Sequence, residues 1–300
     1  MVNKITKKRL KTFIQYDAVK ALLAAVLACV FFVLVFNGFG KQPSDGQSFK
    51  VIVDANISIG EDFVTLSESL KHSDNNNDGF SYEILSYEKI NLYGTDETPA
   101  PSNLLTNYVP LSYDDVCVLT QTVLDVYLKN GCAKELNQYI NEALIYTSQF
   151  LVNGEFDEQK VYNYFDSTRG KDVRFKTAEQ KQKGKENELK RIKAIYNNAT
   201  ALKECFEKHP ELLYNASYEL LGETFEGAYA INFGKLVGKD GAKAENLFNT
   251  NTVINGNEEI TTTDGIFVVV GDTYDKTGDL FFEPLAFLVN LIKSYTNYLG

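Results

Sequence analysis

The sequence predicts an α/β fold that follows a single N-terminal transmembrane helix. Three observations lead to this prediction: a long apolar run near the N-terminus, an alternation of strand and helix patterns over residues 49–120, and a mainly helical section followed by further strands. We therefore expect a two-lobed α/β domain. The first lobe would comprise residues 49–120 and 226–300, and the second, largely helical lobe would comprise residues 121–225.

The apolar run spans residues 18–39, and its centre, ALLAAVLACVFFVLVF, contains no polar side chain. An α-helix needs about 20 apolar residues to cross a bilayer. A cleaved secretory signal is an alternative, but such signals have shorter apolar runs and end at small residues, whereas NGFGKQ follows here. A lipoprotein signal that ends at Cys29 is a second alternative. However, residues 30–36 are apolar, whereas a mature lipoprotein would be polar at these positions. We expect a retained membrane helix.

The charge of residues 1–17 sets the expected orientation. Together with Lys20, this basic tail carries six cations against the single acid Asp17. Basic residues beside a span remain on the cytoplasmic side, so we expect a single-pass plasma-membrane protein with its C-terminal domain outside the cytoplasm. The whole chain has a net charge of −10, so the part beyond the span is acidic. That excludes nucleic acid as an expected partner, because phosphate binding needs a basic face.

Beyond the span, residues 40–48 form a short polar linker that contains Pro and Gly. The pattern FKVIVDAN at 49–56 alternates apolar and polar residues and predicts a strand. EDFVTLSESLK at 61–71 has acids in its first turn and Lys at its end, which favours a helix. After a polar loop, the aromatic and β-branched residues of 80–92 predict another strand.

A short helix at 103–111 and a buried strand at 115–120 continue this order. Alternation of strands and helices favours a parallel sheet. From residue 121 to about 221 nearly every segment has helical spacing, and we expect helices at 135–151, 157–165 and 177–208. Strands at 227–236 and 265–271 and a final amphipathic helix at 281–299 complete the chain. The three cysteines beyond the span, Cys117, Cys132 and Cys205, are too few for a disulfide framework, so we expect buried free thiols.

Residues 74–79, DNNNDG, match the beginning of an EF-hand calcium loop. Asp74, Asn76 and Asp78 would supply the ligands. However, position twelve of such a loop is normally a bidentate Glu and is Leu85 here. We favour an ordinary Asn- and Asp-rich turn, with calcium as the alternative and no other cofactor.

The sequence contains no G-x-S-x-G, P-loop, G-x-G-x-x-G or H-E-x-x-H motif. Its two histidines, His72 and His209, lie in polar, turn-like surroundings. We therefore expect no enzyme, although a hydrolase or transpeptidase stays an open alternative.

The order of the predicted elements resembles that of the two-lobed extracytoplasmic solute-binding proteins of ABC transporters. The segments that carry this resemblance are FKVIVDAN, DVCVLT, GAYAINFGKL, GIFVVVG and EPLAFLVNLIKSY. The resemblance implies a small-molecule solute and a membrane transporter as partners. The chain departs from the family in its retained membrane helix and in its lack of Trp, on which sugar binders commonly stack their ligands.

In open α/β sheets, ligands bind outside the carboxyl ends of the strands. The polar residues expected there are Asp54, Asn56, Thr120, Gln121, Asp272 and Thr273. Each of them could instead simply cap a strand. The sequence thus predicts a membrane-anchored, solute-binding-like or transporter-accessory module. The alternative is a structural or assembly protein of the cell envelope that binds a membrane partner through its helical lobe.

Overall fold

In the computed structural model, the chain forms two separate units, residues 1–44 and residues 45–300. The described residues are 11, 18–39, 48–71, 84–90, 115–171, 175–238, 241, 243–254, 258–272, 282–295 and 298–299. The predicted loop at 72–79, the predicted helix at 103–111 and most of the linker lie outside them.

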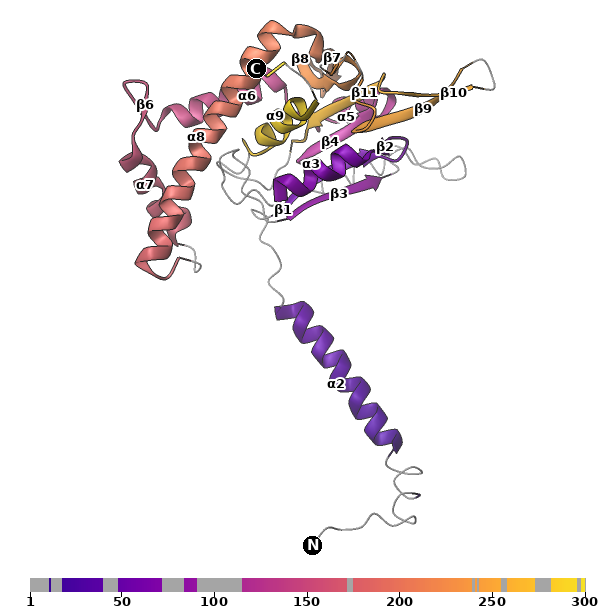
Figure 1. Ribbon diagram of the computed structural model, residues 1–300, viewed down its shortest axis with the longest axis vertical. Coiled ribbons are helices and arrows are strands. Elements are labelled where there is room, and N and C mark those ends of the chain that lie inside the picture. Colours follow the sequence, from indigo (N-terminus) through magenta and orange to yellow (C-terminus); the bar gives the residue numbers. More distant parts are fainter. Residues whose placement is uncertain are drawn as a thin grey trace. The chain divides into compact units, whose positions relative to one another are not determined.

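Helix α2 (Ala18–Phe39) is the described element of the first unit and is 22 residues long (Figure 1). Its described side chains are those of Lys20, Leu22, Leu23 and residues 25–32. Within the residues that the structure describes, no helix is long and apolar enough to qualify as a membrane span.

The second unit is built on a six-stranded sheet with the order β3-β1-β4-β11-β8-β7. Its strands are β1 (Ser48–Asp54), β3 (Ile84–Ile90), β4 (Val116–Thr120), β7 (Leu213–Leu220), β8 (Glu223–Asn232) and β11 (Ile266–Val270). Strands β3, β1 and β4 are parallel, whereas β11, β8 and β7 each run antiparallel to the preceding strand in this order. The α/β class is confirmed, but the sheet is mixed and not the parallel sheet that the alternation favoured.

Both faces of the sheet are covered by helices. In β4, Val116 and Val118 point into one core and Cys117 and Leu119 into the other, as the two-residue period of a strand requires. The larger core receives α3 (Glu61–Lys71) and α9 (Pro284–Tyr295), and the smaller core receives α5 (Gln121–Lys129). All five residues of β11 are buried, which confirms the prediction of a central strand covered on both sides.

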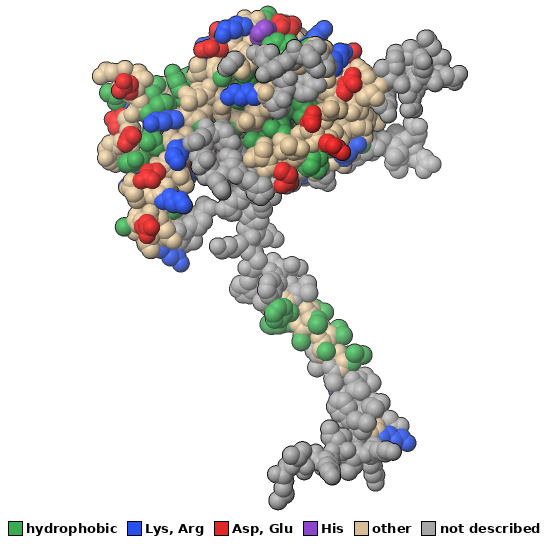
Figure 2. All heavy atoms as spheres, viewed as in Figure 1, with side chains coloured by type: hydrophobic (Ala, Val, Ile, Leu, Met, Phe, Trp, Pro, Cys, Tyr) green, Lys and Arg blue, Asp and Glu red, His purple; other side chains and the backbone are tan. Residues whose placement is uncertain are grey.

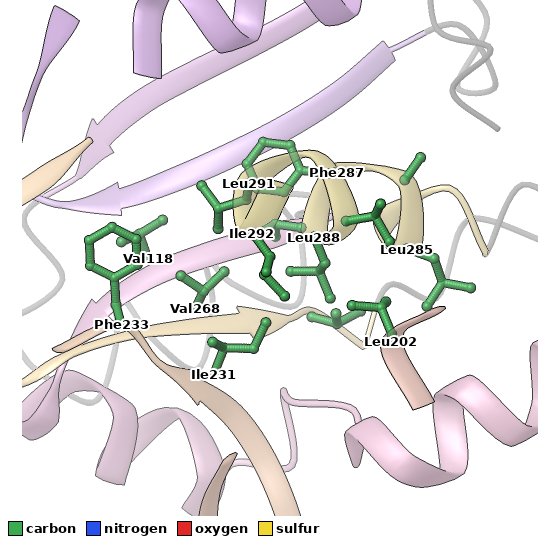
Figure 3. Packing of buried hydrophobic residues seen from close by; sticks show 14 of the residues in the cluster. Val118, Leu202, Ile231, Phe233, Val268, Leu285, Phe287, Leu288, Leu291 and Ile292 are labelled. Carbon is green, nitrogen blue, oxygen red and sulfur yellow. The ribbon is translucent and has the colours of Figure 1, made fainter. Parts of the chain in front are cut away.

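Helix α9 lies at the centre of the larger core (Figure 3). Its apolar side chains, Leu285, Phe287, Leu288, Leu291 and Ile292, pack toward Val118, Ile231 and Val268 of the sheet and toward Leu202 of α8. The chain therefore closes its core with its last helix.

The middle section contains α6 (Leu136–Ser148), α7 (Glu158–Ser167) and α8 (Ala178–Lys208). A two-stranded hairpin, β5 (Leu151–Val152) and β6 (Glu155–Phe156), connects α6 to α7. The predicted helices at 135–151, 157–165 and 177–208 are confirmed. Figure 1 shows α7 and the first half of α8 extending away from the sheet.

The predicted boundary of a helical lobe at residues 121–225 is wrong. Helix α5 packs on the sheet, and β7 is a strand at the edge of that sheet. Residues 45–300 form one compact unit. The sequence of β7, LYNASYEL, alternates partly buried and exposed residues, and this period is that of a strand.

A second sheet of three strands comprises β2 (Ser58–Ile59), β9 (Phe248–Ile254) and β10 (Glu258–Thr262), in the order β10-β9-β2. Strands β9 and β10 were not predicted, because their polar segments NTNT and EEITT lack the apolar residues that indicate a strand.

Candidate functional site

Four of the six predicted ligand residues lie together where β1 and β4 end. The Asp54 side chain is buried, and its Oδ2 accepts a hydrogen bond from Thr120 Oγ1 at 2.5 Å. Its Oδ1 accepts from the backbone nitrogen of Asn56 at 3.0 Å and from Asn56 Nδ2 at 3.2 Å. Gln121 Nε2 donates to Asp125 Oδ1 at 2.8 Å and to the Tyr214 hydroxyl at 2.9 Å.

These contacts satisfy both carboxylate oxygens of Asp54 within the protein. Both oxygens of Asp54 accept hydrogen bonds that hold the turn after β1 and the end of β4 together. A buried carboxylate that is already hydrogen-bonded gains little from a ligand. This edge of the sheet therefore has a structural role in joining β1, β4 and the start of α5.

The prediction that Asp272 shares this edge is wrong. Strand β11 runs antiparallel to β4, so that Ile266 pairs with Thr120 and Val270 pairs with Val116. The carboxyl end of β11 consequently lies at the amino end of β4. Asp272 there forms an ion pair with Lys134, with 2.5 Å between Oδ1 and Nζ.

Thr273, the last of the six residues, lies outside the described part of the chain, as do Asp74, Asn76 and Asp78 of the predicted calcium loop. In the part that the structure describes, no group of three or more His, Cys, Asp or Glu side chains could hold a metal ion. The calcium hypothesis thus gains no support from the described residues.

A cleft of about 350 Å³ lies between α6, α8 and the start of β7. Its lining residues are Asn137, Ile140, Asn141, Lys203, Phe206, Glu207 and Leu213. Ile140 and Phe206 are buried and Leu213 is half-buried, so they form an apolar floor. The two asparagines and the two charged residues are exposed and form the rim. Four of the seven lining residues are thus polar or charged, so a small ligand in this cleft would contact mainly polar groups above a small apolar floor.

Residue spacing places these side chains on facing sides of two helices. Asn137 and Asn141 are four residues apart on α6, and Lys203 and Glu207 are four residues apart on α8, so each pair lies on one helix face. Buried residues of both helices, among them Tyr139, Ala143, Ala199 and Leu202, join the larger core. The core thus fixes the two walls of the cleft.

Glu135 attaches the α6 wall to the sheet. It is the N-cap of α6, where its Oε2 accepts a hydrogen bond from the backbone nitrogen of Gln138 at 2.5 Å. Its Oε1 accepts from the backbone nitrogen of Ala228 in β8 at 2.9 Å. Gly227 leaves room for this contact, since a Cβ there would lie 2.5 Å from Glu135 Cγ.

The α8 wall ends in a short connection to the floor of the cleft. The backbone nitrogen of His209 donates to the carbonyl of Cys205 at 2.8 Å, and a 3₁₀ turn at Pro210–Leu212 leads directly to Leu213. The Glu211 carboxylate lies 3.1 Å from His209 Nδ1. Hydrogen bonds from its own backbone and from His209 lower the pKa of Glu211.

The two charged rim residues, Lys203 and Glu207, are unpaired among the described residues, whereas the charged residues next to them on α8 form an ion pair. Glu204 and Lys208 form an ion pair with 3.7 Å between Oε2 and Nζ, and neither lines the cleft. Within the described part of the chain, Lys203 and Glu207 form no ion pair with each other or with another residue. A Lys that precedes a Glu by four residues is the less favourable order for such a pair, because it opposes the helix dipole. Both rim charges are therefore available to a ligand.

A buried ionic cluster lies further along α8, toward its N-terminus. Arg191 and Glu188 are 1% and 3% exposed, and Arg191 Nη2 lies 2.8 Å from Glu188 Oε1. Arg169 Nη1 also contacts Glu188 Oε2 at 3.3 Å, and Arg191 Nη1 lies 3.8 Å from Glu283 Oε1. These charges neutralise one another inside the protein, which indicates a structural cluster and not a ligand site.

On the face of residues 45–300 that Figure 2 shows, basic and acidic side chains are interspersed. The chain matches no protein-family model, and neither a curated protein nor a solved structure shows significant similarity to it. Evidence on function therefore comes from the geometry of the chain itself.

The cleft was not predicted from the sequence, because its residues are spread over positions 137–213 and its walls meet only through packing. The signal that could have pointed to it is the Lys-before-Glu spacing at Lys203 and Glu207, next to the opposite order at Glu204 and Lys208.

Proposed function

We propose that this chain is a membrane-anchored, extracytoplasmic binding module that takes a small solute in the cleft between α6 and α8. The observation that carries the proposal is the cleft of about 350 Å³, in which Lys203 and Glu207 stand above a buried apolar floor and form no ion pair with any described residue. Ligand cavities in proteins commonly have volumes of about 300–1,000 Å³. The solute-binding function expected from the sequence is retained, but its site moves from the sheet edge to the helices.

The proposed anchor is α2. Its described large apolar side chains are all exposed, from Val30 at 49% to Leu22 at 68%. In Figure 2 they form the apolar surface of this helix. Although no helix among the described residues meets the criterion for a membrane span, the sequence of residues 18–39 supports the anchor. It has the roughly 20 mainly apolar residues that a bilayer crossing requires, and a bilayer would cover this surface. The basic tail before it supports a cytoplasmic N-terminus and thus a domain outside the cytoplasm.

Membrane fractionation of the full chain tests the anchor. We expect the protein to stay in the membrane pellet after alkaline carbonate washing, and its C-terminal domain to be digested by protease added outside intact cells. A variant with Val26→Lys and Val30→Lys should lose this retention, since a charge near the bilayer centre costs about 2.5–3.5 kcal/mol. Release of the wild-type chain by the carbonate wash would contradict the anchor.

Thermal-shift measurements on the full chain test the binding function. A panel of sugars, amino acids, short peptides and small anions should contain at least one class that raises the melting temperature. Asn141→Phe should abolish that shift, because the larger side chain would fill the cleft. Gln138→Phe is the matched control, since Gln138 is exposed on the same helix but does not line the cleft. A panel without any shift, or equal effects of both variants, would contradict the proposal.

A second candidate is an envelope assembly protein that grips a membrane partner through its helices. The observation that favours it is Ile145 on α6, which is 72% exposed and lies one turn beyond Asn141 on the same helix face. If this candidate is correct, Ile145→Asp should reduce the mass of the crosslinked species that the chain forms in native membranes. The thermal shifts of the solute panel would then be absent from the wild type.

A further inference from the structure

We propose that the ligand of the α6–α8 cleft is a zwitterionic peptide of about two residues with an apolar side chain. Glu207 would receive its ammonium group and Lys203 its carboxylate. This inference rests on the proposed binding function and names the class of solute.

The charge spacing supports a peptide of this length. Residues four apart on an α-helix are separated by about 6 Å along its axis. Two extended peptide residues span about 7 Å, so the terminal groups of a dipeptide match the separation of Lys203 and Glu207. A free amino acid holds its two charges closer together, and a longer peptide would place one end outside the cleft.

The rim charges of Lys203 and Glu207 are open to a ligand, whereas the neighbouring charges on α8 are already paired. Glu204 and Lys208 already neutralise each other on the adjacent part of the α8 surface. In the described residues, Lys203 and Glu207 have no partner of opposite charge. A ligand that brings one positive and one negative group would complement both without adding net charge.

The remaining lining residues fit the rest of such a ligand. Ile140 and Phe206 are 2% and 4% exposed, so together with the half-buried Leu213 they give the floor a small apolar surface against which an aliphatic side chain can pack. Opposite Lys203 and Glu207, the Asn141 amide has no hydrogen-bond partner among the described residues. An amide both donates and accepts, so it can bind a peptide group.

Isothermal titration of the full chain in lipid nanodiscs with leucyl-leucine tests this inference, with empty nanodiscs as the blank. Leucyl-leucinamide lacks the carboxylate, and N-acetyl-leucyl-leucine lacks the ammonium group. We expect Lys203→Met to lower the affinity for leucyl-leucine about fivefold and to leave the affinity for leucyl-leucinamide unchanged. Glu207→Gln should lower the affinity for leucyl-leucine to a similar extent and leave the affinity for N-acetyl-leucyl-leucine unchanged.

The matched controls remove the same charges from the same helix outside the cleft. Lys208→Met and Glu204→Gln should leave all three affinities unchanged. Glycyl-glycine, which has both charges and no side chain, should bind about tenfold more weakly than leucyl-leucine, because it cannot bury an aliphatic group. Equal losses in cleft and control variants would overturn the inference, because they would indicate a general effect of surface charge.

Two further outcomes separate this inference from the proposed function. If leucyl-leucine does not bind, but another solute class gives a thermal shift that Asn141→Phe removes, the ligand assignment is overturned and the binding function stands. If no solute class gives a shift, both are overturned.

Discussion

At the scale of single residues, the ion pair Glu188–Arg191 should contribute strongly to stability, because both side chains are almost fully buried. Glu188→Gln removes one charge and leaves Arg191 buried with less compensation. We expect a loss of about 3 kcal/mol in the free energy of unfolding, measured by urea denaturation. Glu186→Gln, which changes an exposed carboxylate on the same helix, should cost less than about 0.5 kcal/mol. Equal losses would show that the buried pair is not a stabilising unit.

Leu221 occupies a backbone conformation that suits it poorly. It has φ of 52° and is 98% exposed at the two-residue turn between β7 and β8, where Gly222 follows with φ of 86°. Such turns favour Asn-Gly, because Asn tolerates the left-handed region better than Leu. Leu221→Asn should therefore stabilise the protein by about 1 kcal/mol in urea denaturation. Leu221→Ala keeps a side chain in the unfavourable conformation and should not stabilise the protein. A gain of the same size in both variants would contradict this explanation.

The Cys205 thiol gives a prediction on pH. Burial, with a smaller contribution from the charge of Glu211, raises its pKa to about 11. The unfolded thiol has a pKa of about 8.5, so this stabilisation is complete below that pH and is lost as the pH rises toward the folded pKa. The gap in melting temperature between the wild type and Cys205→Ala should narrow from about pH 8.5 upward. A gap that is constant over that range would contradict the assignment.

The state of the cysteines could be predicted from the sequence. The structure shows Cys117, Cys132 and Cys205 as buried free thiols, so that prediction is confirmed. The odd number and the wide spacing of these cysteines were sufficient for this prediction, because both can be read from the sequence without the tertiary fold.

At the scale of elements, the contact between α7 and α8 depends on Gly184. A Cβ at this position would lie 2.4 Å from Phe165 Cζ and 2.8 Å from Phe175 Cε1. Helix propensity alone predicts that Gly184→Ala stabilises the protein by about 1 kcal/mol. We expect a net loss of about 1–3 kcal/mol, because the buried Phe165 ring cannot move away. Adding Phe165→Leu to Gly184→Ala should recover part of this loss in thermal unfolding; a stabilising single variant would contradict the close contact.

The elements that the sequence predicted best are those whose signals are local. Helix α3 has the predicted bounds, and α8 begins directly after Thr177. Thr177 Oγ1 accepts a hydrogen bond from the backbone nitrogen of Gln180, and Gln180 Oε1 accepts one from that of Thr177. This capping box is encoded within four residues and can be recognised without tertiary contacts.

Strand direction and strand neighbours could not be obtained in this way. The sequence of β11 is the same whether the strand runs parallel or antiparallel to β4, so the prediction brought Asp272 to the wrong edge. The position of β7 in the sheet likewise follows from its pairing with β8. For the same reason the cleft, which depends on how α6 packs beside α8, was missed although each helix was predicted.

At the scale of the whole molecule, the proposal joins two units with separate tasks. An apolar helix would hold the chain in a bilayer, and a compact α/β unit would bind a solute in its helical part. A module held in this way would act beside a membrane partner, because the linker of residues 40–48 limits how far it can move from the bilayer.

Hydrogen exchange of the full chain in nanodiscs, with and without the solute that gives the largest thermal shift, tests the central claim most directly. The account predicts that the solute slows exchange in residues 136–148 and 203–213, which contain both walls and the floor of the cleft. The segments 54–56 and 120–121 at the end of β1 and β4 should exchange as before. Protection confined to those sheet-edge segments, or no protection in α6 and α8, would contradict the claim that the cleft is the binding site.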